Sequence, residues 1–123
     1  MKQRILIVDD DRLVADTLSL VFRVNGFDSE ARYTAADGLD RARSFAPSLL
    51  LTDVTMPGES GLDLADAVAR EMPDCKLMML TAYESNSAPV QKHSERTQRP
   101  IRMLYKPVHP EELIRAAQQL LLA

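Results

Sequence analysis

The sequence predicts an α/β fold in which a parallel β-sheet is covered by helices on both faces. Short, continuous apolar runs recur at intervals too long for hairpins, and stretches with helical spacing follow them. Continuous rather than alternating apolar strands are typical of a sheet that is buried on both faces. Because the strand-then-helix order occurs five times, we expect five parallel strands joined by right-handed crossovers.

The expected strands are short, and four of them are strongly apolar. These four are Ile5–Val8, Leu49–Leu51, Leu77–Leu80 and Ile101–Leu104. A weaker strand is expected near Ser29–Arg32, where fewer residues are apolar.

Three of the five expected helices have a clear start or stop signal. The first runs from about Leu13 to Asn25-Gly26, which supplies a left-handed stop. The second is expected across Ala35–Phe45, and the third ends where Pro73 interrupts its apolar stripe. The last begins at Pro110, because proline is favoured in the first turn of a helix.

The segment Tyr83–Pro100 fits the pattern least well. It contains poor helix formers and an internal proline, Pro89. We therefore expect the fourth helix to be short or irregular.

Size and composition narrow the classes of function. The 123 residues fit a single domain, 1–123, and we expect no output domain in this chain. The formal charge of −3 argues against a broad surface for nucleic acid, and the single cysteine, Cys75, excludes a disulfide framework. No apolar run approaches membrane-spanning length, so we expect a cytoplasmic protein without membrane contact.

Polar residues stand within two residues of the ends of four of the expected strands. In an open parallel sheet, ligands bind beyond the carboxyl ends of the strands, so these residues should converge on one edge. They are Asp9 and Asp10 after the first strand, Asp53 after the third, Thr81 with the small Ala82 after the fourth, and Lys106 after the fifth.

This set of groups suits the transfer of a phosphoryl group. Three neighbouring carboxylates repel one another, and a hard divalent cation such as Mg²⁺ (or Mn²⁺) relieves that repulsion. One carboxylate, Asp53, can then attack phosphorus and form an acyl phosphate. Lys106 and the Thr81 hydroxyl would meet the charge that develops, and Ala82 leaves the approach open.

Each residue alone has a simpler explanation. Asp11 and its neighbours precede a helix, where capping aspartates are common, and Asp53 could introduce a turn. Taken singly, Thr81 is most often a capping hydroxyl and Lys106 a solvated lysine. It is improbable that all of these explanations hold together at the correct strand ends.

Four motifs resemble the receiver domain of two-component response regulators, in the CheY-like superfamily. The resemblance covers nearly the whole chain, and the four motifs occur in order at nearly the usual spacing. They are ILIVDDD (Ile5–Asp11), LLLTDVTMPGESG (Leu49–Gly61), LMMLTAY (Leu77–Tyr83) and MLYKPVHPEELI (Met103–Ile114). The resemblance implies a flavodoxin-like, doubly wound (βα)5 fold with strand order 2-1-3-4-5.

The resemblance also implies a role for each residue of the set. Asp53 would accept a phosphoryl group from a histidine of a sensor kinase or a phosphotransfer protein. The magnesium ligands would be Asp10, Asp53, the backbone carbonyl of Thr55 and, through water, Asp9. Thr81 would be the switch hydroxyl beside the Ala82 amide, Lys106 would contact the phosphoryl group, and the Lys106–Pro107 peptide bond would be cis.

The chain departs from the family at the residues that report phosphorylation. Met103 stands where the family usually has a switch aromatic, and Tyr105 lies two residues further along the same strand. We expect an altered switch at Met103 and Tyr105. The downstream partner would be an effector or a separate output domain, without direct nucleic-acid binding by this domain, and a weak homodimer is left open.

Two other functions compete with a phosphorylation-controlled signalling module that has no separate metabolic substrate. A scaffold with the same fold would not need the full set of site residues. A phosphohydrolase of the haloacid dehalogenase type normally has a D-x-D motif after its first strand and a cap insertion. The sequence VDDDR fits that motif poorly, and the chain has no room for a cap.

Overall fold

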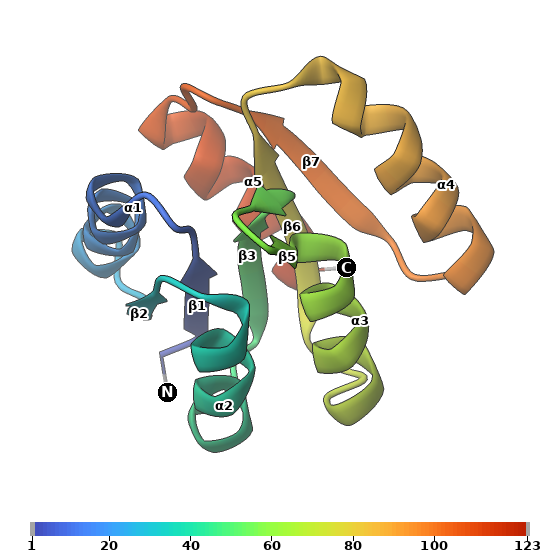
Figure 1. Ribbon diagram of the computed structural model, residues 1–123. Helices are drawn as coiled ribbons and strands as arrows, with labels where there is room; N and C mark the ends of the chain where they lie inside the picture. The colour runs from blue at the N-terminus through green and yellow to red at the C-terminus, as the bar shows by residue number, and fades with distance from the viewer. Residues whose placement is uncertain (1, 123) are drawn as a thin grey trace.

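The computed structural model describes residues 2–122 and has three layers, with a central sheet between two layers of helices (Figure 1). The elements are β1 (Arg4–Val8), α1 (Arg12–Val24), β2 (Asp28–Arg32), α2 (Ala35–Phe45), β3 (Leu49–Asp53), β4 (Thr55–Met56), β5 (Glu59–Ser60), α3 (Gly61–Glu71), β6 (Lys76–Thr81), η1 (Glu84–Asn86, a 3₁₀ turn), α4 (Ser87–Thr97), β7 (Ile101–Tyr105) and α5 (Pro110–Leu122).

The main sheet has five strands in the order β2-β1-β3-β6-β7, and all neighbouring strands are parallel. Because β4 and β5 form a separate hairpin, this order corresponds to the expected 2-1-3-4-5. The predicted strands and helices are confirmed, with ends that differ by a few residues. The largest strand difference is at the third strand, which continues through Thr52 to Asp53.

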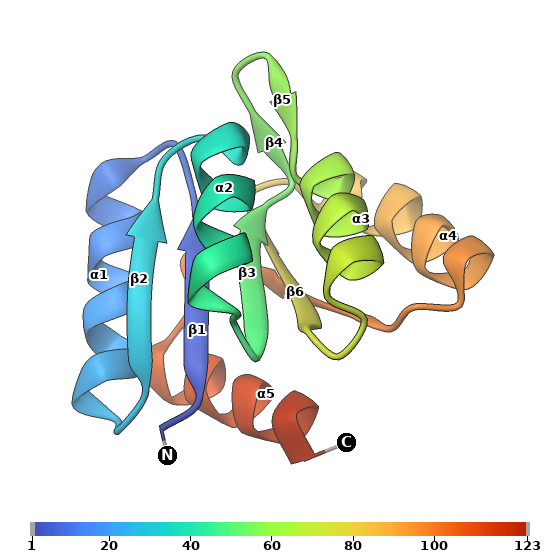
Figure 2. The ribbon, with the colours of Figure 1, turned by 90° about the horizontal axis from the view of Figure 1, so that it is seen from below.

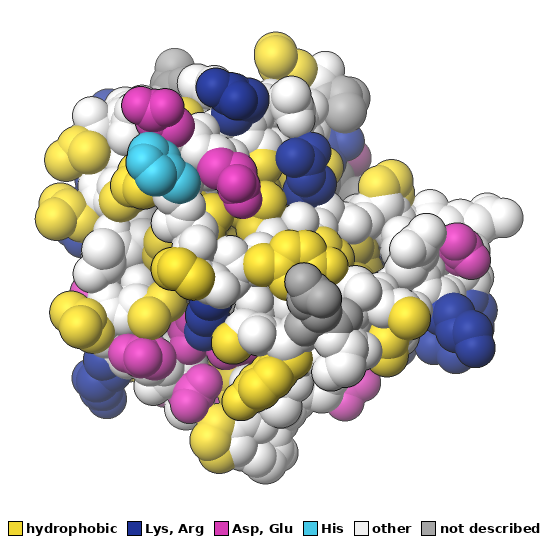
Figure 3. All heavy atoms as spheres, turned by 90° about the horizontal axis from the view of Figure 1, so that it is seen from above, with side chains coloured by type: hydrophobic (Ala, Val, Ile, Leu, Met, Phe, Trp, Pro, Cys, Tyr) yellow, Lys and Arg dark blue, Asp and Glu magenta, His cyan; other side chains and the backbone are white. Residues whose placement is uncertain are grey.

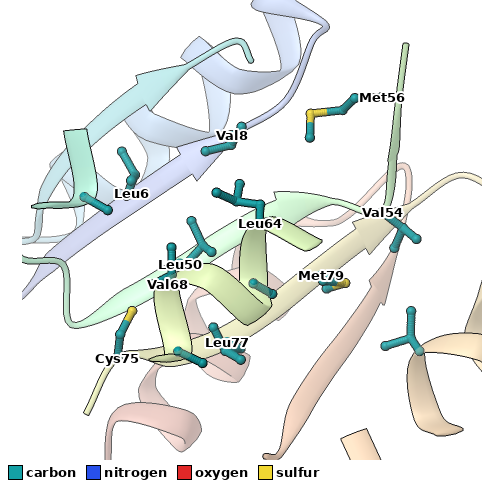
Figure 4. Close-up of a cluster of buried hydrophobic side chains, with 14 residues drawn as sticks. Leu6, Val8, Leu50, Val54, Met56, Leu64, Val68, Cys75, Leu77 and Met79 are labelled. Atoms are coloured by element: carbon teal, nitrogen blue, oxygen red, sulfur yellow. The ribbon is translucent and has the colours of Figure 1, made fainter. Parts of the chain in front are cut away.

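The apolar runs form two cores, one on each face of the sheet. On one face, α1 and α5 cover alternate residues of the strands, including Ile5, Leu51 and Met78. On the other face, α2, α3 and α4 cover the remaining strand residues, among them Leu6 and Met79, as the close-up shows (Figure 4). Because both faces are filled, the strands hold their carboxyl ends rigidly at one edge.

A short hairpin follows β3 and was absent from our expectations. Thr55 pairs with Ser60 and Met56 with Glu59, so Pro57 and Gly58 occupy the centre of the turn. Gly58 has a φ of 69°, which glycine adopts without steric cost. Figure 2 shows the hairpin standing beyond the carboxyl ends of the strands, beside the site described below.

The expectation of a short or irregular fourth helix is confirmed in part, because the helix is not short and its irregularity lies at its start. Helix α4 has 11 residues, the same number as α2 and α3, and its irregular part is limited to the preceding turn η1. Pro89 is the third residue of α4, in the first turn, where a missing N–H breaks no intrahelical bond. Further along, Val90 is buried and His93 Nε2 lies 2.7 Å from Asp66 Oδ1 of α3, so tertiary contacts outweigh the poor helix propensity.

Candidate functional site

Strands β1, β3 and β7 bring two carboxylates and one ammonium group into contact at the carboxyl edge. The Nζ atom of Lys106 lies 2.8 Å from Asp9 Oδ2 and 3.0 Å from Asp53 Oδ2. The sequence predicted that these three residues would meet, because parallel strands end at the same edge. The Lys106–Pro107 peptide bond is cis.

Asp9 is the most buried charged residue of the site, with 2% of its surface exposed. Its Oδ1 accepts a hydrogen bond of 3.0 Å from the backbone N–H of Asp11. Its Oδ2 is buried without a well-directed hydrogen bond, although it forms the 2.8 Å ion pair with Lys106. A buried carboxylate oxygen with spare bonding capacity is suited to a further cationic ligand.

Asp53 ends β3 with its side chain only 12% exposed. Its Oδ1 accepts from the N–H of Thr55 at 3.2 Å, and its Oδ2 accepts from Lys106. Burial raises the pKa of Asp53 and the charge of Asp9 adds to the rise, although the hydrogen bond from Lys106 opposes it. Burial would lower the pKa of Lys106, but the two carboxylates outweigh burial and raise it.

The acidic residues at this edge are arranged to share one cation. Asp9, Asp10 and Asp53 can each offer a carboxylate oxygen such that these oxygens lie within 4.8 Å of one another. Asp10 is exposed, so the shared position opens to solvent. An all-oxygen donor set with one open side fits a hard divalent ion that keeps part of its water shell. Asp11 lies outside this group and caps α1, where its side chain accepts from the N–H of Val14.

Thr81 ends β6 and is fully buried. Its hydroxyl oxygen accepts hydrogen bonds from Tyr83 N at 3.0 Å and from Asn86 Nδ2 at 2.9 Å, and the hydroxyl donates to Tyr83 O at 3.4 Å. Within the part of the chain that the structure describes, none of these bonds reaches Asp53. The structure therefore places Thr81 at the correct edge with its hydroxyl turned toward the loop that precedes α4.

Asn86 was not singled out from the sequence. An asparagine before a helix indicates an ordinary N-cap, and nothing in its spacing from Thr81 reveals a hydrogen bond between the two side chains. The bond arises because η1 folds the chain back over the end of β6.

Gly61, the first residue of α3, lies against the backbone of Asp53. A Cβ atom built at Gly61 would overlap the carbonyl oxygen of Asp53. The backbone N–H of Gly61 donates a hydrogen bond of 2.8 Å to Val54 O. The close approach of α3 to the end of β3 therefore requires glycine at this position.

Four residues of the expected set remain, two beside the buried charges and two on β7. Ala82 and Thr55 are exposed next to the site. Met103 is half-buried and packs against the core, whereas Tyr105 is 41% exposed. Met103 and Tyr105 both line a groove of about 450 Å³ between β7 and α4.

The face of the molecule drawn in Figure 3 is not dominated by one sign of charge. Figure 3 shows apolar side chains interspersed with acidic and basic ones, and no continuous patch of lysine and arginine on the face drawn. Among the described helices, none combines the length and the apolar character that crossing a membrane requires.

Comparisons with known proteins agree with this geometry. The chain is 39% identical over 82 residues to the DNA-binding response regulator MtrA of Mycobacterium tuberculosis, which covers 67% of this chain and 36% of MtrA. It is 36% identical over 87 residues to the response regulator MprA of Mycobacterium bovis, covering 71% of this chain and 38% of MprA. The chain thus spans little more than a third of the length of these relatives.

Solved structures give the same fold. A CheY-like receiver domain protein from Methanospirillum hungatei superposes with a TM-score of 0.88 at 28% identity, covering 98% of this chain and 94% of that one. The chemotaxis protein CheY4 of Vibrio cholerae superposes with a TM-score of 0.87 at 22% identity, covering 98% and 99%. The family model for the response regulator receiver domain matches residues 5–118 of the sequence. The chain therefore belongs to the receiver domains of two-component response regulators.

Proposed function

We propose that Asp53 accepts a phosphoryl group from a phosphohistidine of a sensor kinase or of a histidine phosphotransfer protein. The observation that carries this proposal is the position of the Asp53 carboxylate. It is held between the Lys106 ammonium and the backbone N–H of Thr55, next to a second carboxylate that is almost fully buried. Such an arrangement fixes a nucleophile and supplies positive charge beside it.

In the proposed reaction, one oxygen of Asp53 attacks phosphorus in line with the leaving group. A bond forms between this oxygen and phosphorus, while the bond between phosphorus and the donor's imidazole nitrogen breaks. The electron pair of that bond stays on the imidazole. Lys106 is already 3.0 Å from Asp53, and its ammonium group would contact the phosphoryl oxygens after the transfer.

The residues present fit a magnesium or manganese ion. Asp10, Asp53 and the backbone carbonyl of Thr55 would hold it directly, and Asp9 through water. Such an ion, when bound, offsets the repulsion among the carboxylates and the charge of the incoming phosphoryl group. The buried, spare Oδ2 of Asp9 and the clustered carboxylate oxygens support this assignment.

Phosphorylation would change the conformation at Thr81, Met103 and Tyr105. Thr81 and the Ala82 amide would turn to the phosphoryl group, and the groove that Met103 and Tyr105 line with α4 would change shape. An effector or an output domain would bind the altered surface, in the cytoplasm. In this proposal the domain assists only its own phosphorylation and dephosphorylation, turns over no separate metabolite and binds no nucleic acid itself.

Intact-mass analysis after incubation with magnesium and acetyl phosphate tests the proposal. The protein should gain one phosphoryl group that hydroxylamine removes, as expected of an acyl phosphate. Asp53→Ala should abolish the gain, whereas Asp74→Ala, at an exposed aspartate outside the acidic cluster, should leave it intact. A protein that binds magnesium but gains no phosphoryl group would instead be a scaffold with a receiver fold.

A further inference from the structure

The hydroxyl of Thr81 has no hydrogen-bonding capacity left in this structure. A hydroxyl group can donate one hydrogen bond and accept two. The Thr81 oxygen accepts from Tyr83 N and from Asn86 Nδ2, and its proton is directed at Tyr83 O. Before it can donate to a group on Asp53, its proton must leave Tyr83 O, and a rotation that carries Oγ1 toward Asp53 also breaks the bonds from Tyr83 N and Asn86 Nδ2.

The Asn86 side chain links both flanks of Asp53. Its Nδ2 donates to Thr81 Oγ1 at 2.9 Å and, over a longer 3.4 Å, to Thr55 Oγ1. Thr55 is the residue whose N–H donates to the Asp53 carboxylate. One half-buried amide group therefore connects the end of β6 with the start of β4, on either side of the proposed phosphoacceptor.

Asn86 also stands directly before α4. Asparagine at this position usually accepts a hydrogen bond from a first-turn N–H of the helix. Here the backbone of Asn86 is helical, with φ −80° and ψ −13°, and its side chain makes no capping bond. The side chain is directed to the site instead, so any displacement of Thr81 acts on the residue that directly precedes α4.

We propose that Asn86 is a latch that holds Thr81 in its resting orientation and is released when Asp53 carries a phosphoryl group. This inference rests on the proposed function of Asp53 and Thr81. Asn86 is a positioning residue, because it acts through Thr81 and not on the phosphoryl group. Its release would also free the start of α4, which couples the site to the groove beside Met103.

The latch predicts that removal of the Asn86 amide favours the phosphorylated form. A single hydrogen bond of this kind corresponds to about a 2- to 10-fold change in an equilibrium constant. Asn86→Ala should therefore bind beryllium fluoride, a phosphoryl mimic, about 2- to 10-fold more tightly in saturating magnesium. Titration followed by ¹H–¹⁵N NMR of the Ala82 and α4 amides measures this affinity.

Two comparisons separate a latch from a merely structural role. In the Thr81→Val background, Asn86→Ala should leave the affinity unchanged, because the side chain has no hydroxyl to hold. Asn25→Ala removes a comparable side-chain hydrogen bond, from Asn25 Nδ2 to Val21 O, at the far end of α1. This variant should bind beryllium fluoride with unchanged affinity. A gain in affinity that persists without the Thr81 hydroxyl would overturn the latch.

The side-chain amide of Asn86 supplies a direct signal. Its two N–H resonances should be dispersed in the resting protein and should move toward free-amide positions when beryllium fluoride binds. Unchanged Asn86 resonances, or equal affinities of Asn86→Ala and the unmodified protein, would overturn the latch while leaving phosphorylation of Asp53 in place. Failure of the unmodified protein both to bind the mimic and to gain a phosphoryl group would overturn the proposed function, and the latch with it.

Discussion

The Lys106 ammonium lies 3.0 Å from Oδ2 of Asp53, although 53 residues separate the two in the chain. The contact exists because β3 and β7 both end at the carboxyl edge of the sheet. Lys106 also lies 2.8 Å from Asp9, so it is the shared counterion of two carboxylates, one of them almost fully buried. In a metal-free protein, this single ammonium group therefore faces two carboxylates and offsets only part of their negative charge.

Replacement of Lys106 by methionine should destabilise the metal-free protein. We expect Lys106→Met to lower the free energy of unfolding by about 1–3 kcal/mol, because the buried carboxylates lose their charged donor. Magnesium should restore part of this loss, since an ion that binds only the folded state stabilises it. Urea unfolding with and without magnesium measures both effects.

The exposed Lys92 on α4 provides the control for Lys106. Lys92→Met should change the free energy of unfolding by less than about 0.5 kcal/mol, with or without magnesium. If Lys106→Met were equally harmless in metal-free buffer, the proposed role of Lys106 as counterion would be wrong.

Two glycines should respond very differently to a methyl group. At Gly61 an added Cβ overlaps the backbone of Asp53, which cannot move without displacing the carboxylate that we propose as the phosphoacceptor. At Gly38 the Cβ meets Val8 Cγ2 at 2.6 Å, and that contact is with a side chain. We expect Gly61→Ala to lower the free energy of unfolding by about 3 kcal/mol or more. The contact with Val8 should make Gly38→Ala cost about 1–2 kcal/mol, and the higher helix propensity of alanine should offset part of that cost.

Thermal unfolding of the two alanine variants checks the ranking. Gly61→Ala should also reduce the rate of phosphorylation by acetyl phosphate at a temperature where the protein is still folded. A Gly61→Ala protein with unaltered stability would show that α3 and β3 can separate without loss of packing.

The ion pair of Glu30 with Arg41 should make stability depend on acid pH. Two guanidinium hydrogen bonds of 2.7 Å from Arg41 hold the pKa of Glu30 below its usual 4.5. A carboxyl whose pKa is lowered by folding stabilises the protein fully above the unfolded pKa, and the effect disappears as the pH falls through the folded pKa. We expect Arg41→Met to cost about 0.5–1 kcal/mol at pH 7 and nothing once Glu30 is protonated in both states.

Urea unfolding of Arg41→Met from pH 7 to pH 3 measures this convergence. The more exposed pair of Arg43 with Glu71 supplies a comparison, and Arg43→Met should cost less than Arg41→Met at pH 7. A difference for Arg41→Met that stayed constant down to pH 3 would have to come from lost packing of the guanidinium over Phe45 instead.

The sequence predicted the parts of the fold and site that depend on strand polarity. Asp9, Asp53 and Lys106 each stand within two residues of the end of an apolar run, and in a parallel sheet that position alone brings them to one edge. The burial of both sheet faces could likewise be predicted from continuous apolar strands such as Ile5–Val8.

The remaining features depend on contacts between segments that carry no common pattern. The hairpin of Thr55–Met56 with Glu59–Ser60 contains too few residues for any periodicity. The bond from Asn86 to Thr81 requires the path of η1, which neither residue type reveals. Helix α4 is formed against its propensity by the burial of Val90, which depends on the position of α3 and β7.

The thiol of Cys75 should be almost inert at neutral pH. Cys75 is buried at the start of β6, and burial raises the pKa of its thiol to about 12. Because the thiolate is the reactive form and a free cysteine has a pKa of about 8.5, the thiolate fraction at pH 8 should be at least about a hundredfold lower than in an unfolded chain. Iodoacetamide labelling of the native and urea-unfolded protein, followed by intact mass, measures the ratio. The native rate should increase about tenfold for each unit of pH up to the limit of stability, whereas rapid native labelling at pH 8 would show that the chain opens locally around the start of β6.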